Sequence, residues 1–340
     1  MRFLYAVGRP AFPFFIGGDG TIAHTMLTGL DRIGVDCRYI GTFGDYVVRK
    51  LGRLDAIPHV LTAESLSYCV PYPVTLALDE QFADLVEKTI AEFRPDVVFT
   101  QLDQAREVIA LAKRYGCRTA LYVLDLEHKE NFRALDAEPE LIFAVSDFTR
   151  RELSRRFGKE SQVLYPLLDV ERYVTPRTDE FVTMINPIAV KGVEIALELA
   201  ERLPEQEFLF VEGWGTDPAI LERIARLPNA TYLNKQMDMR KVYGRTRVLL
   251  VPSQWEEAFG RVVVEAQASG IPVIASRTGG LPEAVGDGGV LIDDYRDPDR
   301  WLTALQGLRY EELSAKAIEN TRRFNLPREL DRLLGILRSS

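Results

Sequence analysis

Hydrophobic residues in this chain gather in short runs that alternate with longer amphipathic stretches. In the first half, apolar runs predict strands near 2–7, 36–41, 96–100, 118–124 and 141–145. Apolar residues at helical spacing predict helices over 21–33, 81–93, 105–115 and 147–157. Because strands and helices alternate, the pattern predicts an α/β fold with a parallel sheet covered on both faces.

The second half repeats this rhythm. Strands are predicted at 181–185, 207–211, 231–233, 248–251 and 272–275, and helices at 191–203, 259–268 and 328–337. Between the halves, residues 162–178 contain two prolines and little periodicity, which is typical of a linker. A length of 340 residues also suits two α/β domains better than one core.

Composition excludes several classes of protein. The chain is 46% hydrophobic and 27% charged, as in an ordinary soluble globular protein. No apolar run reaches the roughly 18 residues needed to span a bilayer, and the first residues read as a core strand, so we expect a cytoplasmic protein. A net charge of -8 argues against general nucleic-acid binding. Three widely spaced cysteines and three histidines favour reduced thiols over disulfides, and they predict no metal site.

The stretch over 252–283 carries two carboxylates, Glu257 and Glu265, on either side of a Phe-Gly turn. Glu257 comes just before a predicted helix, and Glu265 lies about two turns inside it. The backbone N–H groups of Phe259, Gly260 and Arg261 fall at the start of that helix, where they can hold a diphosphate. Gly260 lets a ligand approach the backbone closely. These features together predict a sugar-nucleotide site.

The same stretch resembles the E-x7-E signature of family 4 of the retaining glycosyltransferases with the GT-B fold. It matches PS-x-x-x-E-x-F-G-x-x-x-x-E-A followed by G-x-P-V-x-A-S-x-x-G-G-x-P-E. The resemblance implies two Rossmann-like, doubly wound parallel-sheet domains that face a central cleft. An acceptor-side domain would cover 1–165 and a nucleotide-sugar donor domain 166–324, with a helix over 325–340 packing back on the first domain.

The resemblance also implies roles for individual residues of the signature. Glu257 would contact hydroxyls of the donor sugar, and Phe259 and Gly260 would present backbone amides to it. Glu265 would bind the nucleotide ribose.

A second motif, NPIAVKG, lies between a predicted strand and a helix. Lys191 can place a positive charge on a phosphate there, aided by the helix that follows. The family usually has an arginine five residues before this lysine, where Asn186 stands in this chain. Asparagine carries no charge, so part of the expected stabilisation of the leaving group is missing. Arg261, at the start of the helix that carries Glu265, is a candidate for supplying that charge, the alternative being a solvent-exposed arginine.

Three further loops resemble ligand-binding parts of the family. Gly17 and Gly18 belong to a glycine-rich loop that would face the donor diphosphate and the acceptor, although it does not match the dinucleotide fingerprint. Gly213 lies in a loop near the nucleotide. Lys235 and Gln236 follow a strand at the place where the base would be read, or form a solvated loop.

Asp125 and His128 follow the fourth predicted strand. Related enzymes carry an aspartate or a histidine in this region, near the acceptor, so Asp125 is a candidate catalytic residue. A polar pair that only satisfies hydrogen bonds at a strand end is the alternative.

The predicted reaction moves a sugar from a nucleoside-diphosphate sugar to an acceptor hydroxyl or amine, with retention of configuration. The acceptor would be a small molecule, a glycan or a lipid-linked molecule. The chemistry needs no metal and no cofactor besides the donor substrate. A sugar-nucleotide epimerase of the same architecture is one alternative, and a weakly active nucleotide-sugar-binding subunit, motivated by Asn186, is another.

A basic helix over 149–159 bears on the acceptor. It carries four arginines and a lysine, so it could rest on anionic lipid, as in family members that glycosylate membrane acceptors. A solvated face is the alternative. Nothing in the pattern indicates an oligomeric state.

Overall fold

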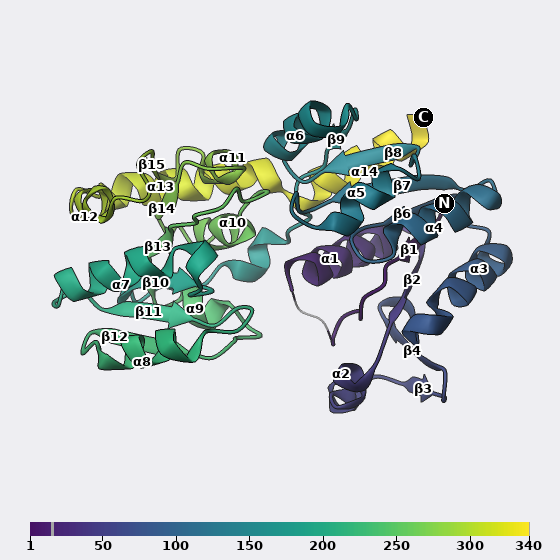
Figure 1. The fold of residues 1–340 in the computed structure, drawn as a ribbon, viewed down its shortest axis with the longest axis horizontal. Helices are drawn as coiled ribbons and strands as arrows, with labels where there is room; N and C mark the ends of the chain where they lie inside the picture. The colour runs from purple at the N-terminus through teal and green to yellow at the C-terminus, as the bar shows by residue number, and fades with distance from the viewer. Residues whose placement is uncertain (15–16, 340) are drawn as a thin grey trace. The chain divides into compact units, whose positions relative to one another are not determined.

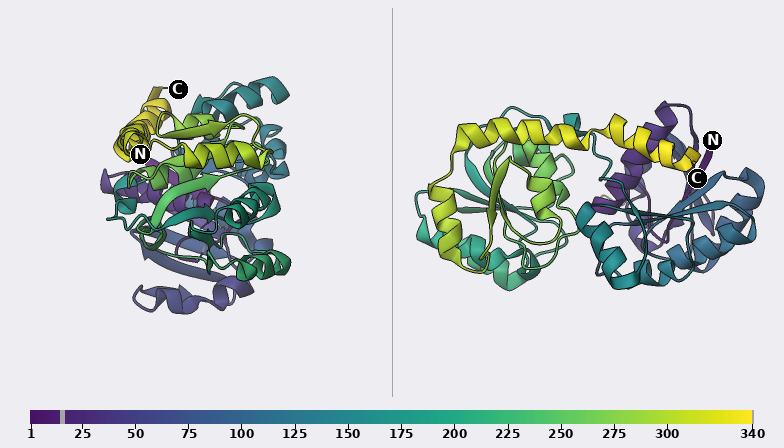
Figure 2. Two further views of the ribbon diagram at one scale, coloured as in Figure 1. Left: turned by 90° about the vertical axis from the view of Figure 1, so that its left-hand side faces the viewer. Right: turned by 90° about the horizontal axis from the view of Figure 1, so that it is seen from above.

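The chain folds into two compact units. The structure is a computed structural model that describes residues 1–14 and 17–339. The first unit comprises Met1–Leu168 with Leu326–Ser340, and the second Asp169–Asn325 (Figure 1). Each unit is a sheet with helices on both faces, as the turned views show (Figure 2). The predicted α/β class with two Rossmann-like sheets is confirmed.

The first unit is built on a sheet with the strand order β3-β4-β5-β2-β1-β6-β7-β8-β9. Its strands are β1 (Arg2–Ala6), β2 (Asp36–Thr42), β3 (His59–Leu61), β4 (Ser65–Val70), β5 (Tyr72–Ala77), β6 (Val97–Thr100), β7 (Arg118–Val123), β8 (Leu141–Ala144) and β9 (Gln162–Val163). Its helices are α1 (Gly18–Arg32), α2 (Asp45–Val48), α3 (Phe82–Phe93), α4 (Ala105–Arg114), α5 (Lys129–Leu135), α6 (Asp147–Phe157) and α14 (Leu326–Ser339).

Strands β3, β4 and β5 were not predicted. They form the edge of the sheet, where β4 pairs antiparallel with both β3 and β5, while β5 joins β2 in parallel. All residues of β3 are exposed, so its hydrophobic pattern differs from that of a buried strand. The short helix α5 was also missed, because seven residues carry too little helical periodicity to be recognised.

Strand β1 shows why the central strands read as continuous apolar runs. Leu4 and Ala6 face the core formed with α3 and α4, where Val86 and Val108 lie. Tyr5, on the opposite face, stacks on Tyr39 with ring centroids 5.5 Å apart. Alternate residues point to opposite faces of a strand, so a sheet covered on both sides needs apolar residues at every position.

Helix α14 packs on α1 within the first unit. It begins at Leu326, two residues before the predicted start, because a proline is tolerated in the first turn of a helix. Leu330 lies so close to Gly29 that a Cβ at 29 would come within 2.5 Å of Leu330 Cδ1. Buried Glu329 of α14 accepts a hydrogen bond from the backbone N of Tyr165 at 3.1 Å, and desolvation raises its pKa.

The second unit is built on a parallel sheet with the order β12-β11-β10-β13-β14-β15. Its strands are β10 (Phe181–Ile185), β11 (Phe208–Val211), β12 (Ala230–Leu233), β13 (Thr246–Val251), β14 (Val273–Ser276) and β15 (Gly289–Ile292). Its helices are α7 (Val193–Arg202), α8 (Pro218–Arg226), α9 (Arg240–Tyr243), α10 (Arg261–Gln267), α11 (Leu281–Val285), α12 (Pro298–Gln306) and α13 (Tyr310–Thr321).

Each sheet has one point where the strand order reverses. In the first unit it lies between β1 and β6, and in the second between β10 and β13. Loops leave neighbouring strands in opposite directions there, which opens a crevice at the carboxyl ends of the strands. In the second unit, a ligand site is therefore expected at the loops after β10 and β13.

Candidate functional site

The loops after β10 and β13 bring Lys191 and Glu257 together. Lys191 Nζ donates to Glu257 Oε1 at 2.5 Å, although the residues are far apart in sequence. The Ser253 hydroxyl donates to the same oxygen at 2.5 Å. Both charged side chains are largely covered, with 15% and 14% of their side-chain surface exposed. An ammonium and a carboxylate thus lie side by side at the point where a ligand of this fold is expected.

Gly192 allows the two loops to approach this closely. Its φ of +79° is left-handed, and a Cβ at this position would lie 1.9 Å from the carbonyl oxygen of Pro252. The backbone N of Gln254 also donates to the carbonyl of Val190 at 2.9 Å. Lys191 ends a short 3-10 turn, Ala189–Lys191, just before α7, and does not begin that helix as predicted. The glycine ends the turn, and Lys191 precedes it in the loop after β10.

Asn186 has a structural task in this loop. Its φ is +64°, a left-handed conformation that asparagine tolerates better than most residues. It is buried, and its Oδ1 accepts a hydrogen bond from the backbone N of Trp214 at 3.0 Å. Gly213 lies directly against the asparagine side chain. The residue that replaces the expected arginine therefore joins the loops after β10 and β11.

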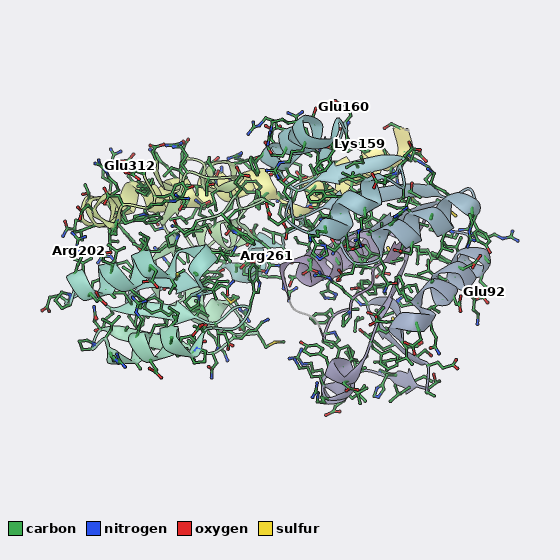
Figure 3. All side chains as sticks on the ribbon, viewed as in Figure 1. Glu92, Lys159, Glu160, Arg202, Arg261 and Glu312 are labelled. Atoms are coloured by element: carbon green, nitrogen blue, oxygen red, sulfur yellow. The ribbon has the colours of Figure 1, made fainter. Side chains whose placement is uncertain are left out.

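Glu265 is buried, with 1% of its surface exposed. Arg261 Nε lies 2.7 Å from Glu265 Oε1, and the Tyr243 hydroxyl donates to Oε2 at 2.7 Å. Arg261, marked in Figure 3, thus directs its guanidinium toward Glu265. Burial and the carboxylate together raise the pKa of Tyr243. The compensation for Asn186 assigned to Arg261 stays a prediction, and it would require the arginine to leave this carboxylate.

Helix α10 begins at Arg261, two residues later than predicted. Glu265 consequently lies about one turn inside the helix, and the predicted position two turns inside is wrong. Gly260, with a φ of +100°, caps the helix, and no side chain can easily replace it there. Phe259 is buried against Phe324 with ring centroids 5.2 Å apart. The Phe-Gly turn is fixed by packing, and its contact with the donor stays a prediction.

The loop after β12 is held by backbone contacts. The backbone N of Lys235 donates to Glu212 Oε2 at 3.1 Å, and Gln236 Nε2 donates to the carbonyl of Asn234 at 2.6 Å. These bonds shape the loop without involving the lysine side chain. A role of Lys235 at the nucleotide base stays a prediction.

The glycine-rich loop of the first unit is partly helical. Gly17 is the N-cap of α1, and its carbonyl accepts a hydrogen bond from the backbone N of Thr21 at 3.0 Å. Gly18 is the first residue of the helix, so the prediction of a helix starting at 21 is wrong by one turn. Asp19 lies in that first turn, where a negative charge is favourable and can offset the poor helix propensity of glycine.

Asp19 belongs to a charged cluster at the carboxyl ends of β1, β6 and β7. Arg9 Nη1 lies 2.8 Å from Asp19 Oδ2, and Arg9 Nε lies 2.5 Å from Asp103 Oδ2. His128 Nε2 is 3.2 Å from Arg9 Nη2 and 3.3 Å from Asp103 Oδ1. Burial lowers the pKa of Arg9, but the two carboxylates raise it above its usual value. The cluster lies where the strand order of the first sheet reverses.

The sequence pointed to His128 but not to Arg9 or Asp103. Arg9 follows β1 and Asp103 follows β6, the two strands on either side of the reversal point. A correct prediction of the strand order would therefore have indicated both residues. Asp125 lies outside the cluster's contacts, since its Oδ1 accepts from the backbone N of Glu127 at 2.7 Å and shapes a turn. A catalytic role for Asp125 stays a prediction.

Helix α6 is the predicted basic helix. Arg150 and Arg151 pair with Asp147, and Arg155 and Arg156 pair with Glu152. The arginines lower the pKa of Glu152 to about 2. Lys159, labelled in Figure 3, follows the helix. The pairing with two carboxylates halves the charge of the four arginines, which favours the solvated-face alternative.

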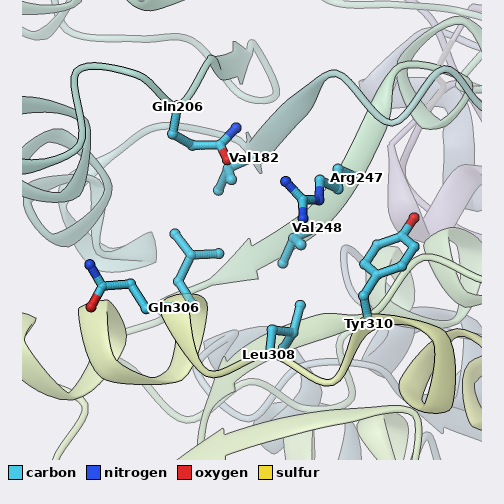
Figure 4. A pocket seen from close by; sticks show the side chains of 8 residues that line it. Val182, Gln206, Arg247, Val248, Gln306, Leu308 and Tyr310 are labelled. Carbon is cyan, nitrogen blue, oxygen red and sulfur yellow. The ribbon is translucent and has the colours of Figure 1, made fainter.

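A small hollow of about 100 Å³ lies at the opposite, amino-terminal edge of the second sheet (Figure 4). Val182, Val248 and Arg247 line it together with Tyr310. Ligand pockets for molecules of nucleotide size usually measure about 300–1,000 Å³. The hollow is therefore too small for a nucleotide sugar.

The described residues lack two kinds of feature. Residues 1–14 and 17–339 contain no helix with the length and apolar character needed to cross a membrane. The same part of the chain holds no group of three or more His, Cys, Asp or Glu side chains arranged to hold a metal ion.

Comparison with known proteins points to one family. Residues 170–324 match the family described as glycosyl transferases group 1. The D-inositol 3-phosphate glycosyltransferase of Corynebacterium kroppenstedtii is 44% identical over 96 residues, covering 28% of this chain and 19% of that protein. The protein of the same name from Rhodococcus jostii is 32% identical over 237 residues, covering 58% of this chain and 52% of that protein. The chain thus spans only a fifth to a half of the length of these relatives.

Solved structures share the whole fold. A glycosyltransferase from Rickettsia africae has a TM-score of 0.73 at 17% identity, covering 100% of this chain and 99% of that chain. Alr3699/HepE from Anabaena, in complex with UDP and glucose, has a TM-score of 0.77 at 18% identity and covers 100% of both chains. These similarities establish the GT-B fold, and residues 170–324 match the glycosyl transferases of group 1.

Proposed function

We propose that this protein transfers a glycosyl group from a nucleoside-diphosphate sugar to an acceptor hydroxyl or amine, with retention of anomeric configuration. The observation that carries the proposal is the contact between Lys191 and Glu257 at the carboxyl edge of β10 and β13. A cation for a diphosphate and a carboxylate for sugar hydroxyls are the two groups that such a donor needs side by side.

In the proposed reaction, the acceptor oxygen or nitrogen attacks the anomeric carbon while the bond from that carbon to the diphosphate oxygen breaks. The electron pair stays on the leaving oxygen, which takes the acceptor proton. Lys191 stabilises the negative charge that develops there. Glu257 holds the donor sugar through its hydroxyls, so that the anomeric carbon is correctly oriented. The ion pair keeps both side chains in place before the donor arrives.

Glu265 is proposed to bind the nucleotide ribose. Its carboxylate is covered by Arg261, Tyr243 and Tyr173 in this structure, so a ribose hydroxyl can reach it only if one of these side chains moves. The arginine is the more exposed partner, with 21% of its side chain accessible. We therefore expect nucleotide binding to rearrange this pair, while Tyr243 continues to hold the second carboxylate oxygen.

The named relatives support the donor class. The curated relatives are called D-inositol 3-phosphate glycosyltransferases, and the Anabaena neighbour was solved with UDP and glucose. A nucleoside-diphosphate sugar is accordingly the donor we propose, with a UDP-sugar as the first choice. The match to a transferase family does not favour the epimerase alternative. We propose that neither a metal nor another cofactor takes part.

The cluster around Arg9 is the proposed acceptor site in the first unit. It combines donors and acceptors of hydrogen bonds at the crevice position of its sheet, as a hydroxyl-bearing acceptor requires. Since one guanidinium faces two carboxylates, the cluster suits a neutral polyol better than a phosphate ester. An acceptor held by α6 on a lipid surface is the weaker candidate, because its arginines are already paired.

A thermal-shift screen tests the donor. UDP, GDP, ADP and dTDP are added separately, and the nucleotide that binds the folded protein must raise the melting temperature. Incubation with the matching nucleotide sugar alone then separates the alternatives. An epimerised donor would identify an epimerase, and tight nucleotide binding without transfer or donor hydrolysis would identify a binding subunit. Transfer to an acceptor, with the donor's anomeric configuration kept in the product by NMR, is the result expected here.

A further inference from the structure

Two tryptophan rings surround the ammonium of Lys191. Its Nζ lies 4.9 Å from the centroid of the Trp214 ring and 4.6 Å from that of Trp255. The rings meet edge to face, with centroids 6.0 Å apart and an angle of 68° between their planes. Both distances fall within the roughly 6 Å over which a ring face attracts a cation. The ammonium therefore has three neighbours that favour its charge, namely the two rings and Glu257.

Backbone hydrogen bonds at or next to each tryptophan connect its loop to the loop that carries Lys191. Trp214 follows β11, and its N–H donates to Asn186 Oδ1 at 3.0 Å, which ties it to the loop that carries Lys191. Trp255 follows β13, next to Gln254, whose N–H donates to the carbonyl of Val190 at 2.9 Å. The rings and the lysine thus belong to three loops that are hydrogen-bonded to one another at the sheet edge.

The orientation of Trp255 supports a role for its ring face. A buried indole N–H usually finds an acceptor, but Trp255 Nε1 is buried and has none among the described residues. Its ring face, in contrast, lies toward the Lys191 ammonium. Trp214 is also unusual, since 66% of its surface is exposed, which is uncommon for so large an apolar side chain.

We propose that Trp214 and Trp255 are positioning residues that hold the Lys191 ammonium in place for the diphosphate of the donor. The role rests on the proposed function, in which Lys191 contacts that diphosphate. Asn186 carries no charge, so the position of the Lys191 ammonium matters more for the diphosphate. A planar ring face attracts the ammonium without neutralising it, which leaves the positive charge available to a phosphate.

A double-mutant cycle tests the contact without any nucleotide. Trp214→Leu and Trp214→Phe are each made in the wild-type chain and in Lys191→Met, and unfolding by denaturant is followed by far-UV circular dichroism. If the ring holds the cation, Trp214→Leu changes the unfolding equilibrium constant about two- to fivefold more when Lys191 is present than when it is absent. Trp214→Phe keeps a ring face and should retain most of this coupling. Equal effects in both backgrounds would overturn the proposal.

Calorimetry then tests the consequence for binding. The nucleoside diphosphate selected by the thermal-shift screen should bind Trp214→Leu and Trp255→Leu about three- to tenfold more weakly than wild type, with Trp214→Phe close to wild type. Equal loss in the Leu and Phe variants would show that the ring face is irrelevant and overturn the proposal, as would wild-type affinity in both Leu variants. If the wild-type protein bound no nucleotide, the proposed function would fail, while the cycle would still decide whether the rings hold Lys191.

Discussion

Replacing Arg261 by methionine should destabilise the second unit without changing its fold. The methionine retains most of the apolar stem and removes only the guanidinium, which lies 2.7 Å from Glu265. Glu265 would then be a carboxylate with 1% exposure whose neighbours include only neutral phenols among the described contacts, Tyr243 and Tyr173. A charge left in such surroundings is costly, because neither water nor a cation compensates for its desolvation.

The exposure of the two partners sets the size of the effect. A fully exposed ion pair contributes roughly 0.2–1 kcal/mol, and removal of one partner from a buried pair costs about 3–5 kcal/mol. Glu265 is buried, but Arg261 has 21% of its side chain exposed, which places this pair between the two cases. We expect Arg261→Met to lower the free energy of unfolding by about 2 kcal/mol.

Tryptophan fluorescence is a suitable assay. The three tryptophans, Trp214, Trp255 and Trp301, all lie in the second unit, so their emission follows the unfolding of that unit alone. The matched variants are Glu265→Gln, which keeps an acceptor for Tyr243, and the double variant with Arg261→Met. The double variant should be about 1 kcal/mol more stable than the sum of the single effects predicts. Strictly additive effects, or a loss below about 0.5 kcal/mol in Arg261→Met, would refute this account of the pair.

Four further results are expected. Glu265→Ala should weaken binding of the nucleoside diphosphate alone, whereas Glu257→Ala should mainly lower turnover, about a hundredfold; equal losses of affinity by calorimetry would contradict this division. Transfer should continue in EDTA, and activity that disappears and returns with Mn²⁺ or Mg²⁺ would show a metal requirement. Because desolvation raises the pKa of Glu329, its contribution to stability is full below its unfolded pKa and is lost as the pH rises through the folded pKa. As the pH rises from acid to neutral, the melting temperature of Glu329→Gln should therefore fall less than that of the wild type. An identical pH dependence of the two melting temperatures would contradict this. Asn186→Arg should lower the stability of the second unit by about 1–3 kcal/mol, because it places a long side chain at a left-handed φ beside Gly213; unchanged fluorescence-detected unfolding would contradict it.

Much of the fold could be predicted, because buried parallel strands carry strong patterns. Strand β10 and helix α6 begin and end at the predicted residues. Strand β10 is a buried apolar run, and α6 lies between the N-cap Ser146 and Gly158, which is in a left-handed conformation. The exposed strand β3 and the one-turn helix α2 lack such patterns. Strand β3 forms a hairpin with β4 at the exposed edge of the sheet, and four residues are too few to show a helical period.

The part of the candidate site that lies in contiguous sequence motifs could be predicted. Lys191 and Glu257 were both expected at the diphosphate and the sugar, and Gly192 explains why the lysine needs a glycine after it. The partners of Arg261 and Asn186 could not be predicted, because they depend on side-chain directions at loop ends. The cluster around Arg9 and the two rings beside Lys191 are assembled from several loops and have no contiguous signature.

Binding of the donor diphosphate by Lys191 is tested most directly by calorimetry on two lysine variants. UDP, GDP, ADP and dTDP are titrated in turn into the wild-type protein, Lys191→Met and Lys241→Met, a control at an exposed lysine of α9 in the same unit. We predict that at least one nucleotide binds the wild type and the control equally, and that Lys191→Met binds it at least tenfold more weakly, a difference of about 1.4 kcal/mol. Equal affinity in all three proteins, or no binding of any nucleotide to the wild type, would contradict the account.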